Sequence, residues 1–99
     1  MYKITYSGSV SDDLKSLGAP ERTQILDEID VQLSHEPGRE TRNRKILVGL
    51  VPPWEHVPPV WKLRIDEYRV FYDIHDKAKL VMVRAIRHKP PHKTTEEIL

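Results

Sequence analysis

The sequence predicts an α+β domain in which an antiparallel sheet carries a helical hairpin on one face. Three observations lead to this prediction. The N-terminus alternates in polarity like a strand, residues 25–33 carry an apolar stripe at helical spacing, and three alternating segments follow between residues 60 and 87. The links between these last segments are so short that the strands must pair antiparallel. The order is β-α-α-β-β-β, and 99 residues make one domain, residues 1–99.

The N-terminal half accounts for the helical hairpin. Residues 2–6 form the first strand, and Ser9 can cap a short helix that Gly18 is placed to end. Pro20 suits the first turn of the second helix, which Pro37 and Gly38 stop. The apolar stripe of the second helix must be buried on the sheet, and it consists of Ile25, Leu26, Ile29 and Leu33.

The C-terminal half accounts for the rest of the sheet. Residues 39–59 show no clear period and contain two Pro-Pro pairs, which indicates an ordered surface loop with a short strand at 46–50. Strands are expected at 60–65, 68–75 and 79–87, joined by tight turns. Residues 96–99 form either a frayed tail or a short helix that covers the sheet.

Composition excludes several classes of protein. No apolar run approaches the roughly 18 residues that a membrane span requires, and the N-terminus lacks the apolar region of a signal peptide. We therefore expect a soluble, cytoplasmic protein. The chain has no cysteine, which rules out disulfides and thiolate chemistry.

The distribution of charge is more informative than the net charge of +1. Residues 1–38 carry seven acidic and three basic side chains, whereas residues 39–64 carry six basic and two acidic ones. A local basic surface is typical of binding to nucleic acid or to an acidic partner. On charge alone, a solvated face without a function explains the same distribution.

Motifs for metals and cofactors are missing. His88 and His92 lie four residues apart, but the two prolines between them prevent a helical turn that would align them. The sequence has no glycine-rich phosphate loop, no dinucleotide fingerprint and no serine nucleophile motif. We expect neither a metal nor a cofactor.

The cationic strands offer a chemistry of their own. Alternation places Lys62 and Arg64 on the face opposite Trp61. RNA can be cleaved without metal if a base takes the 2′-hydroxyl proton, cations stabilise the phosphorane and an acid protonates the leaving oxygen. Lys62, among other cations, suits the base, and Arg69, expected to be exposed on its strand, suits charge stabilisation. Alternatively, Lys62 and Arg64 merely pair with acids such as Glu55 or Asp73.

Several segments together resemble the RelE/ParE superfamily of toxins from type II toxin–antitoxin systems, and the resemblance covers essentially the whole chain. They are residues 42–45 (RNRK), 61–64 (WKLR), 68–72 (YRVFY) and 83–89 (VRAIRHK), in that order after the helical hairpin. The resemblance implies a RelE-like α+β fold and a cognate antitoxin as partner, in a hetero-oligomer. It implies mRNA cleavage on the ribosome for the RelE branch, and DNA gyrase as the target for the ParE branch.

Carried over by position, the resemblance also implies site residues. Lys62, Arg69 and Lys89 match catalytic positions of the RelE branch, and His88 or His92 replaces a C-terminal tyrosine that this chain lacks. The expected activity is a ribosome-dependent, metal-independent mRNA endoribonuclease. A gyrase inhibitor and a non-catalytic toxin that only binds an antitoxin remain alternatives. The expected RNA contacts are Arg42, Arg44, Lys45, Arg64 and Arg87.

Overall fold

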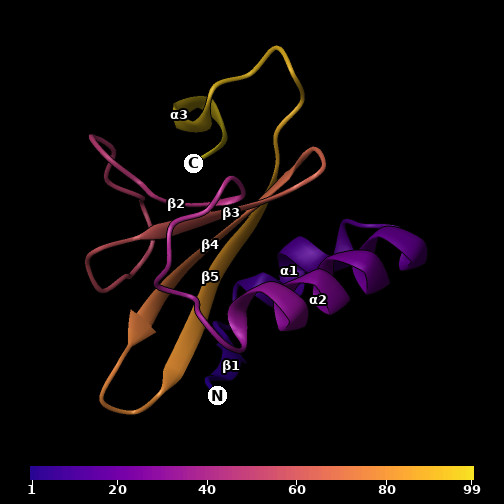
Figure 1. Cartoon of the computed structure of the whole chain (residues 1–99). Coiled ribbons are helices and arrows are strands. Elements are labelled where there is room, and N and C mark those ends of the chain that lie inside the picture. The colour runs from indigo at the N-terminus through magenta and orange to yellow at the C-terminus, as the bar shows by residue number, and fades with distance from the viewer.

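A five-stranded sheet organises the computed structural model, which describes all 99 residues (Figure 1). The strand order across the sheet is β1-β5-β4-β3-β2. The elements, in chain order, are β1 (Lys3–Tyr6), α1 (Val10–Lys15), α2 (Ala19–Leu33), β2 (Arg44–Ile46), β3 (Trp61–Ile65), β4 (Tyr68–His75), β5 (Leu80–His88) and α3 (Thr95–Ile98).

Strands β2 to β5 pair antiparallel, as expected, but β1 lies parallel to β5. The sheet is therefore mixed, and the prediction of a purely antiparallel sheet was wrong at this edge. Short links determine how the last three strands pair, but β1 pairs with a strand more than 70 residues away. No turn constrains that pairing, so link length could not reveal it.

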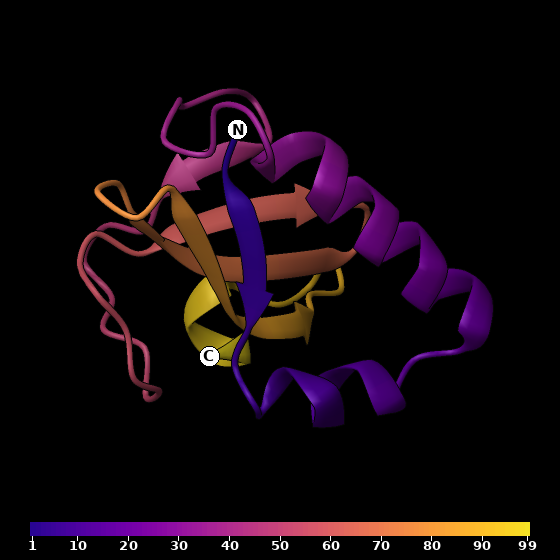
Figure 2. The same ribbon diagram turned by 90° about the horizontal axis from the view of Figure 1, so that it is seen from below.

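The two faces of the sheet are covered by different helices (Figures 1 and 2). On one face, the stripe of α2 packs through Ile25, Ile29 and Leu33 on the inward side chains of β3, which confirms the helical hairpin. On the other face, Ile98 of α3 packs with Phe71 and other buried apolar residues. The C-terminus is therefore a short helix that covers the sheet.

Several boundaries differ from the prediction. Strand β2 occupies residues 44–46 instead of 46–50, and its pairing with β3 ends where Ile46 meets Trp61. Two prolines precede Val60 and cannot donate hydrogen bonds to a ladder, and Gly49 has a φ of 77° that no strand permits. Gly18 does not end α1; it is the extended N-cap residue of α2.

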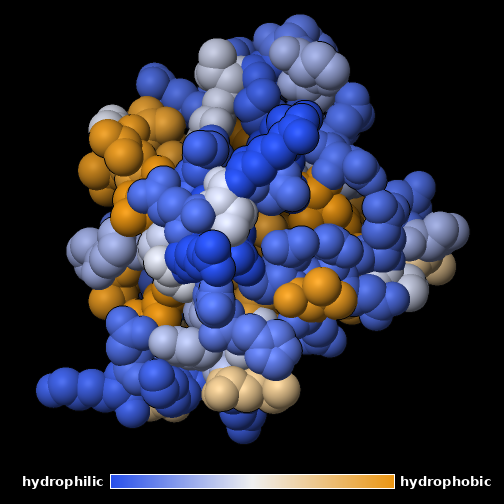
Figure 3. Space-filling view, viewed as in Figure 1, coloured by the Kyte–Doolittle hydropathy of each residue, from blue (hydrophilic) through white to orange (hydrophobic).

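Residues 47–60 form a loop that a buried carboxylate holds to the sheet. Asp73 of β4 is fully buried and accepts hydrogen bonds from the Arg84 side chain at 2.8 Å and from the Val57 amide at 3.0 Å. The same loop exposes Val48 and Val51, and Figure 3 shows apolar side chains gathered at this end of the molecule. None of the helices combines the length and the apolar character needed to cross a membrane.

Candidate nucleic-acid interface

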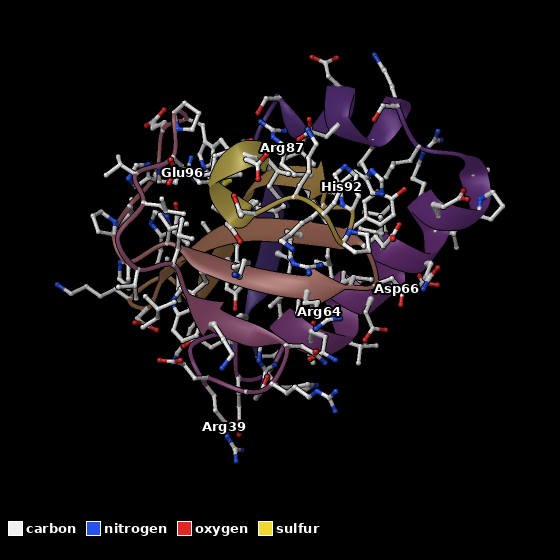
Figure 4. All side chains as sticks on the ribbon, turned by 90° about the horizontal axis from the view of Figure 1, so that it is seen from above. Arg39, Arg64, Asp66, Arg87, His92 and Glu96 are labelled. Carbon is white, nitrogen blue, oxygen red and sulfur yellow. The ribbon has the colours of Figure 1, made fainter.

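An open pocket of about 220 Å³ brings together cations from residues 42–45, from β3, from β4 and from the residue after β5. We call it the basic pocket. It contains six cationic side chains, one amide and no carboxylate, from Arg42, Asn43, Lys45, Lys62, Arg64, Arg69 and Lys89. It lies on the sheet face that carries α3, where Figure 4 shows Arg64 projecting from β3.

Strand register brings these cations together. Lys45 lies directly opposite Lys62 across the β2–β3 pair, and Arg64 lies opposite Arg69 across the β3–β4 pair. Like charges at facing positions destabilise a sheet, so this arrangement is unfavourable unless an anion binds there. The register thus concentrates positive charge and lowers the stability of the folded protein.

Arg69 is the most buried side chain of the basic pocket and is 8% exposed. Its Nη1 donates hydrogen bonds to the carbonyl oxygens of Asp66 and Tyr68, both at 2.9 Å. These bonds fix the plane of the guanidinium, and its Nε and Nη2 have no hydrogen-bond partner in the protein. The expectation of an exposed arginine was wrong. Arg69 is instead a preoriented fork with donors left for phosphate oxygens.

Lys62 is partly buried beside three other cations. Burial is the main reason that its pKa is lowered, and the charges of Arg69, Lys89 and Lys45 lower it further. Its Nζ donates a hydrogen bond to Thr95 Oγ1 of α3 at 3.3 Å. A lysine with a lowered pKa has a larger neutral fraction near neutral pH, which is the form that can accept a proton.

Ion pairing does not explain the cations of the basic pocket. No carboxylate oxygen lies within 4.0 Å of any of them, whereas Asp73 is engaged by Arg84 and His75 on β5 and β4. The alternative in which Lys62 and Arg64 pair with Glu55 or Asp73 is therefore not what the structure shows.

The structure does not bring His88 to the basic pocket. His88 faces Tyr68 across the β4–β5 pair, with ring centroids 5.2 Å apart, and its Nε2 lies 3.3 Å from Glu67 Oε2. Tyr68 packs against the core under the helices, so His88 lies on the opposite face of the sheet from Arg69. His92 also lies outside the pocket, in the exposed segment before α3 (Figure 4).

Two of the expected RNA contacts also lie elsewhere. Arg44 is buried, and its guanidinium donates hydrogen bonds to the carbonyl oxygens of Gln32 and Arg39. Arg87 pairs with Asp13 at 2.8 Å and lies over the Trp54 ring, next to α3 and away from Arg64 (Figure 4). Both guanidinium groups already have partners within the protein, and the structure does not bring them to the basic pocket.

Asn43 lines the basic pocket, and sequence reasoning gave it no role. Its side-chain amide makes no hydrogen bond within the protein, while its carbonyl oxygen accepts one from the Arg64 amide at 2.8 Å. Its position between two arginines in a basic segment was a signal that could have been used.

Comparison with known proteins identifies the family of this chain. The model of the family described as "ParE toxin of type II toxin-antitoxin system, parDE" matches residues 4–89. No curated protein matches the chain. The chain belongs to the ParE toxin family, within the RelE/ParE superfamily of type II toxin–antitoxin toxins.

The fold is that of several solved toxins. The archaeal RelE–RelB complex from Pyrococcus horikoshii OT3 is 22% identical, with a TM-score of 0.68 over 94% of this chain and 98% of that one. The RelBE2 complex from Mycobacterium tuberculosis is 22% identical, with a TM-score of 0.70 over 89% of this chain and 98% of that one. The isolated E. coli RelE toxin is 20% identical, with a TM-score of 0.67 over 98% of this chain and 94% of that one. These similarities establish the RelE-like fold.

Proposed function

We propose that this toxin inhibits translation by cutting mRNA on the ribosome, without a metal ion. The observation that carries this proposal is the basic pocket, in which six cations meet and no carboxylate neutralises them. A phosphodiester is the ligand that such a pocket suits, because its negative charge is shared by two oxygens that can accept from several fixed donors at once.

The proposed mechanism uses three side chains of the pocket. Neutral Lys62 takes the proton of the 2′-hydroxyl, and the 2′-oxygen attacks the adjacent phosphorus. Arg69, with its plane already fixed, stabilises the charge that develops on the phosphorane. The bond from phosphorus to the 5′-oxygen then breaks, and that oxygen takes a proton from the Lys89 ammonium. The products are a 2′,3′-cyclic phosphate and a 5′-hydroxyl.

The remaining cations would position the RNA. Arg42, Lys45 and Arg64 are exposed around Lys62 and Arg69, where they can contact neighbouring phosphates. Arg44 and Arg87 are not part of this proposal, because their guanidinium groups already have partners. His88 is left out for its position on the other face of the sheet.

We also propose an antitoxin partner that binds in a hetero-oligomer and a cytoplasmic location. Several structures with the same fold are complexes of RelE with RelB. An acidic, amphipathic segment that folds on binding would complement the unpaired cations of this chain. A pull-down with the products of the two adjacent genes tests the partner, and failure to bind either at moderate salt would remove this part of the proposal.

Primer extension on mRNA from translating extracts tests the enzyme. Cleavage should persist with a chelator that removes transition metals but leaves the magnesium that ribosomes need, because no proposed step uses a metal. Lys62→Arg should abolish it, because a guanidinium cannot release its proton near neutral pH. Lys77→Arg, in an exposed turn outside the pocket, is the matched control and should cut like the unmodified protein.

Inhibition of DNA gyrase is the second candidate, since the matching family model is the one named for ParE. Such a toxin needs a binding surface and no catalytic side chains. If the chain arrests growth with supercoiling defects and no mRNA cleavage, and if Lys62→Arg remains toxic, gyrase is the target. A chain that binds its antitoxin but causes neither effect would be the non-catalytic alternative.

A further inference from the structure

A second pocket of about 470 Å³ adjoins the basic pocket between α2 and the β3–β4 turn. The two pockets share Arg42, Asn43 and Arg64 in their walls, so they are adjacent. The second pocket differs in charge, because its other polar side chains are one amide and two carboxylates instead of cations. We call it the acceptor pocket, and these side chains are Gln24, Glu28 and Asp66.

These acceptors are held in place and remain partly free. Gln24 Nε2 donates to Asp66 Oδ2 at 2.8 Å, and Gln32 donates to Glu28 Oε1 at 3.0 Å. The second oxygen of each carboxylate has no partner in the protein. Although Arg42 and Arg64 line the same pocket, neither lies within 4.0 Å of Glu28 or Asp66. The carboxylates therefore stay available to a ligand.

The β3–β4 turn fixes the two pockets relative to each other. Asp66 has a φ of 50°, a left-handed conformation that aspartate tolerates in tight turns. The Asp66 carbonyl oxygen accepts a hydrogen bond from Arg69 of the basic pocket, while its carboxylate lines the acceptor pocket. Figure 4 shows Asp66 at the end of β3, beyond Arg64. One residue thus links both pockets.

Carboxylates beside a phosphate-binding pocket repel the RNA backbone, so they must face some other part of the nucleotide. The ribose 2′-hydroxyl is a donor that every nucleotide shares, whereas the donors on the edge of an unstacked base differ from base to base. Cytosine and adenine present an amino group there, and guanine presents an amino group beside a ring N–H. Uracil presents one N–H between two carbonyl oxygens, which carboxylates repel.

We infer that the acceptor pocket reads the base next to the phosphate held in the basic pocket, and that it selects amino-bearing bases over uracil. This inference rests on one part of the proposed function, the binding of RNA in the basic pocket. The volume of the acceptor pocket lies within the range typical of small-ligand sites. The specificity would come from Glu28 and Asp66, while the affinity would come from the cations.

Fluorescence anisotropy with labelled RNA hexamers tests the inference. Oligocytidine should bind at least about fivefold more tightly than oligouridine, on the scale of one good base contact. The double variant Glu28→Gln, Asp66→Asn keeps the shapes of both side chains but adds amide donors. It should bring this ratio close to one by binding oligouridine more tightly. Asp30→Asn, exposed on the same helix, removes one charge outside the pocket and should leave the ratio unchanged.

Equal affinity of the unmodified protein for both hexamers would overturn the inference, as would a preference that survives in the double variant. Absence of binding to either hexamer at about 50 mM salt would overturn it as well. Base preference and cleavage are measured separately. If the protein prefers oligocytidine but cuts no mRNA, the nuclease proposal fails and the inference about the acceptor pocket stands. If it cuts mRNA but binds both hexamers equally, the nuclease proposal stands and the inference fails.

Discussion

Lys45 and Lys62 face each other across the β2–β3 pair, and no carboxylate lies within 4.0 Å of either ammonium group. Two like charges at directly opposed positions cost stability. The same register places both side chains in the basic pocket. The position that weakens the sheet is therefore the one that concentrates charge for an anionic ligand.

Replacing Lys45 by glutamine should separate these two effects. Lys45→Gln removes the repulsion and should raise the free energy of unfolding by about 0.2–1 kcal/mol at low salt, with a smaller gain at high salt. RNA affinity should fall and depend less on salt. Urea denaturation and anisotropy measure the two quantities, with Lys77→Gln as the control for loss of an exposed lysine. A loss of stability in Lys45→Gln would show that the pair is not repulsive.

Arg42 and Arg44 should give opposite results, although they are two residues apart. Arg44→Ala leaves partly buried carbonyl oxygens of Gln32 and Arg39 without their donor, and should lower the free energy of unfolding by about 1.5–3 kcal/mol. Arg42→Ala should leave stability within about 0.5 kcal/mol and weaken RNA binding. The reverse pattern in denaturation and binding curves would contradict the placement of Arg44.

Arg69 should combine both roles. Arg69→Lys keeps the charge but cannot bond two main-chain carbonyls and a phosphate with one planar group. We expect a loss of about 1–3 kcal/mol in stability and a fall in cleavage of roughly 100-fold. Cleavage should be compared at a temperature where circular dichroism shows both proteins to be folded. Full activity in folded Arg69→Lys would show that charge alone is sufficient.

The pH dependence of cleavage should reveal Lys62 and no histidine. The active form has neutral Lys62 and protonated Lys89, so the rate should rise with pH as Lys62 loses its proton, and the pKa of Lys62 lies below the ordinary 10.5. His88 lies on the other face of the sheet, so His88→Ala should leave the profile unchanged. If the pH–rate profile changes slope at about pH 6.5 and this change disappears in His88→Ala, then His88 takes part in the reaction.

The docking of α3 should weaken in acid. Hydrogen bonds with Thr94 lower the pKa of Glu97 below 4.5 and form a capping box at the start of the helix. A carboxyl group with a lowered pKa stabilises the folded state above its unfolded pKa, and this contribution is lost as the pH falls through the folded value. The methyl resonances of Ile98 should therefore broaden or shift below about pH 4.5. Glu97→Gln should remove this acid transition, whereas Glu96→Gln should retain it.

The sequence by itself determined the local features of this protein. Alternation in residues 61–65 placed Lys62 and Arg64 on one face of a strand, and the spacing of Ile25, Ile29 and Leu33 gave α2 its buried side. Both depend on backbone periods that neighbours in the chain reveal. Lys62 and Arg69 were chosen from their residue types and strand positions, and Lys89 from the family resemblance. The three side chains line one pocket.

Only the tertiary structure decided which cations are free. Arg44 and Lys45 are adjacent, but strand β2 begins at Arg44 and not at residue 46, so these two side chains point to opposite faces. Arg44 then meets carbonyl oxygens of α2 and the following loop, and Lys45 meets Lys62. Asp13 similarly reaches Arg87 from 74 residues away. Partners so distant in the chain are set by packing, which no local pattern encodes.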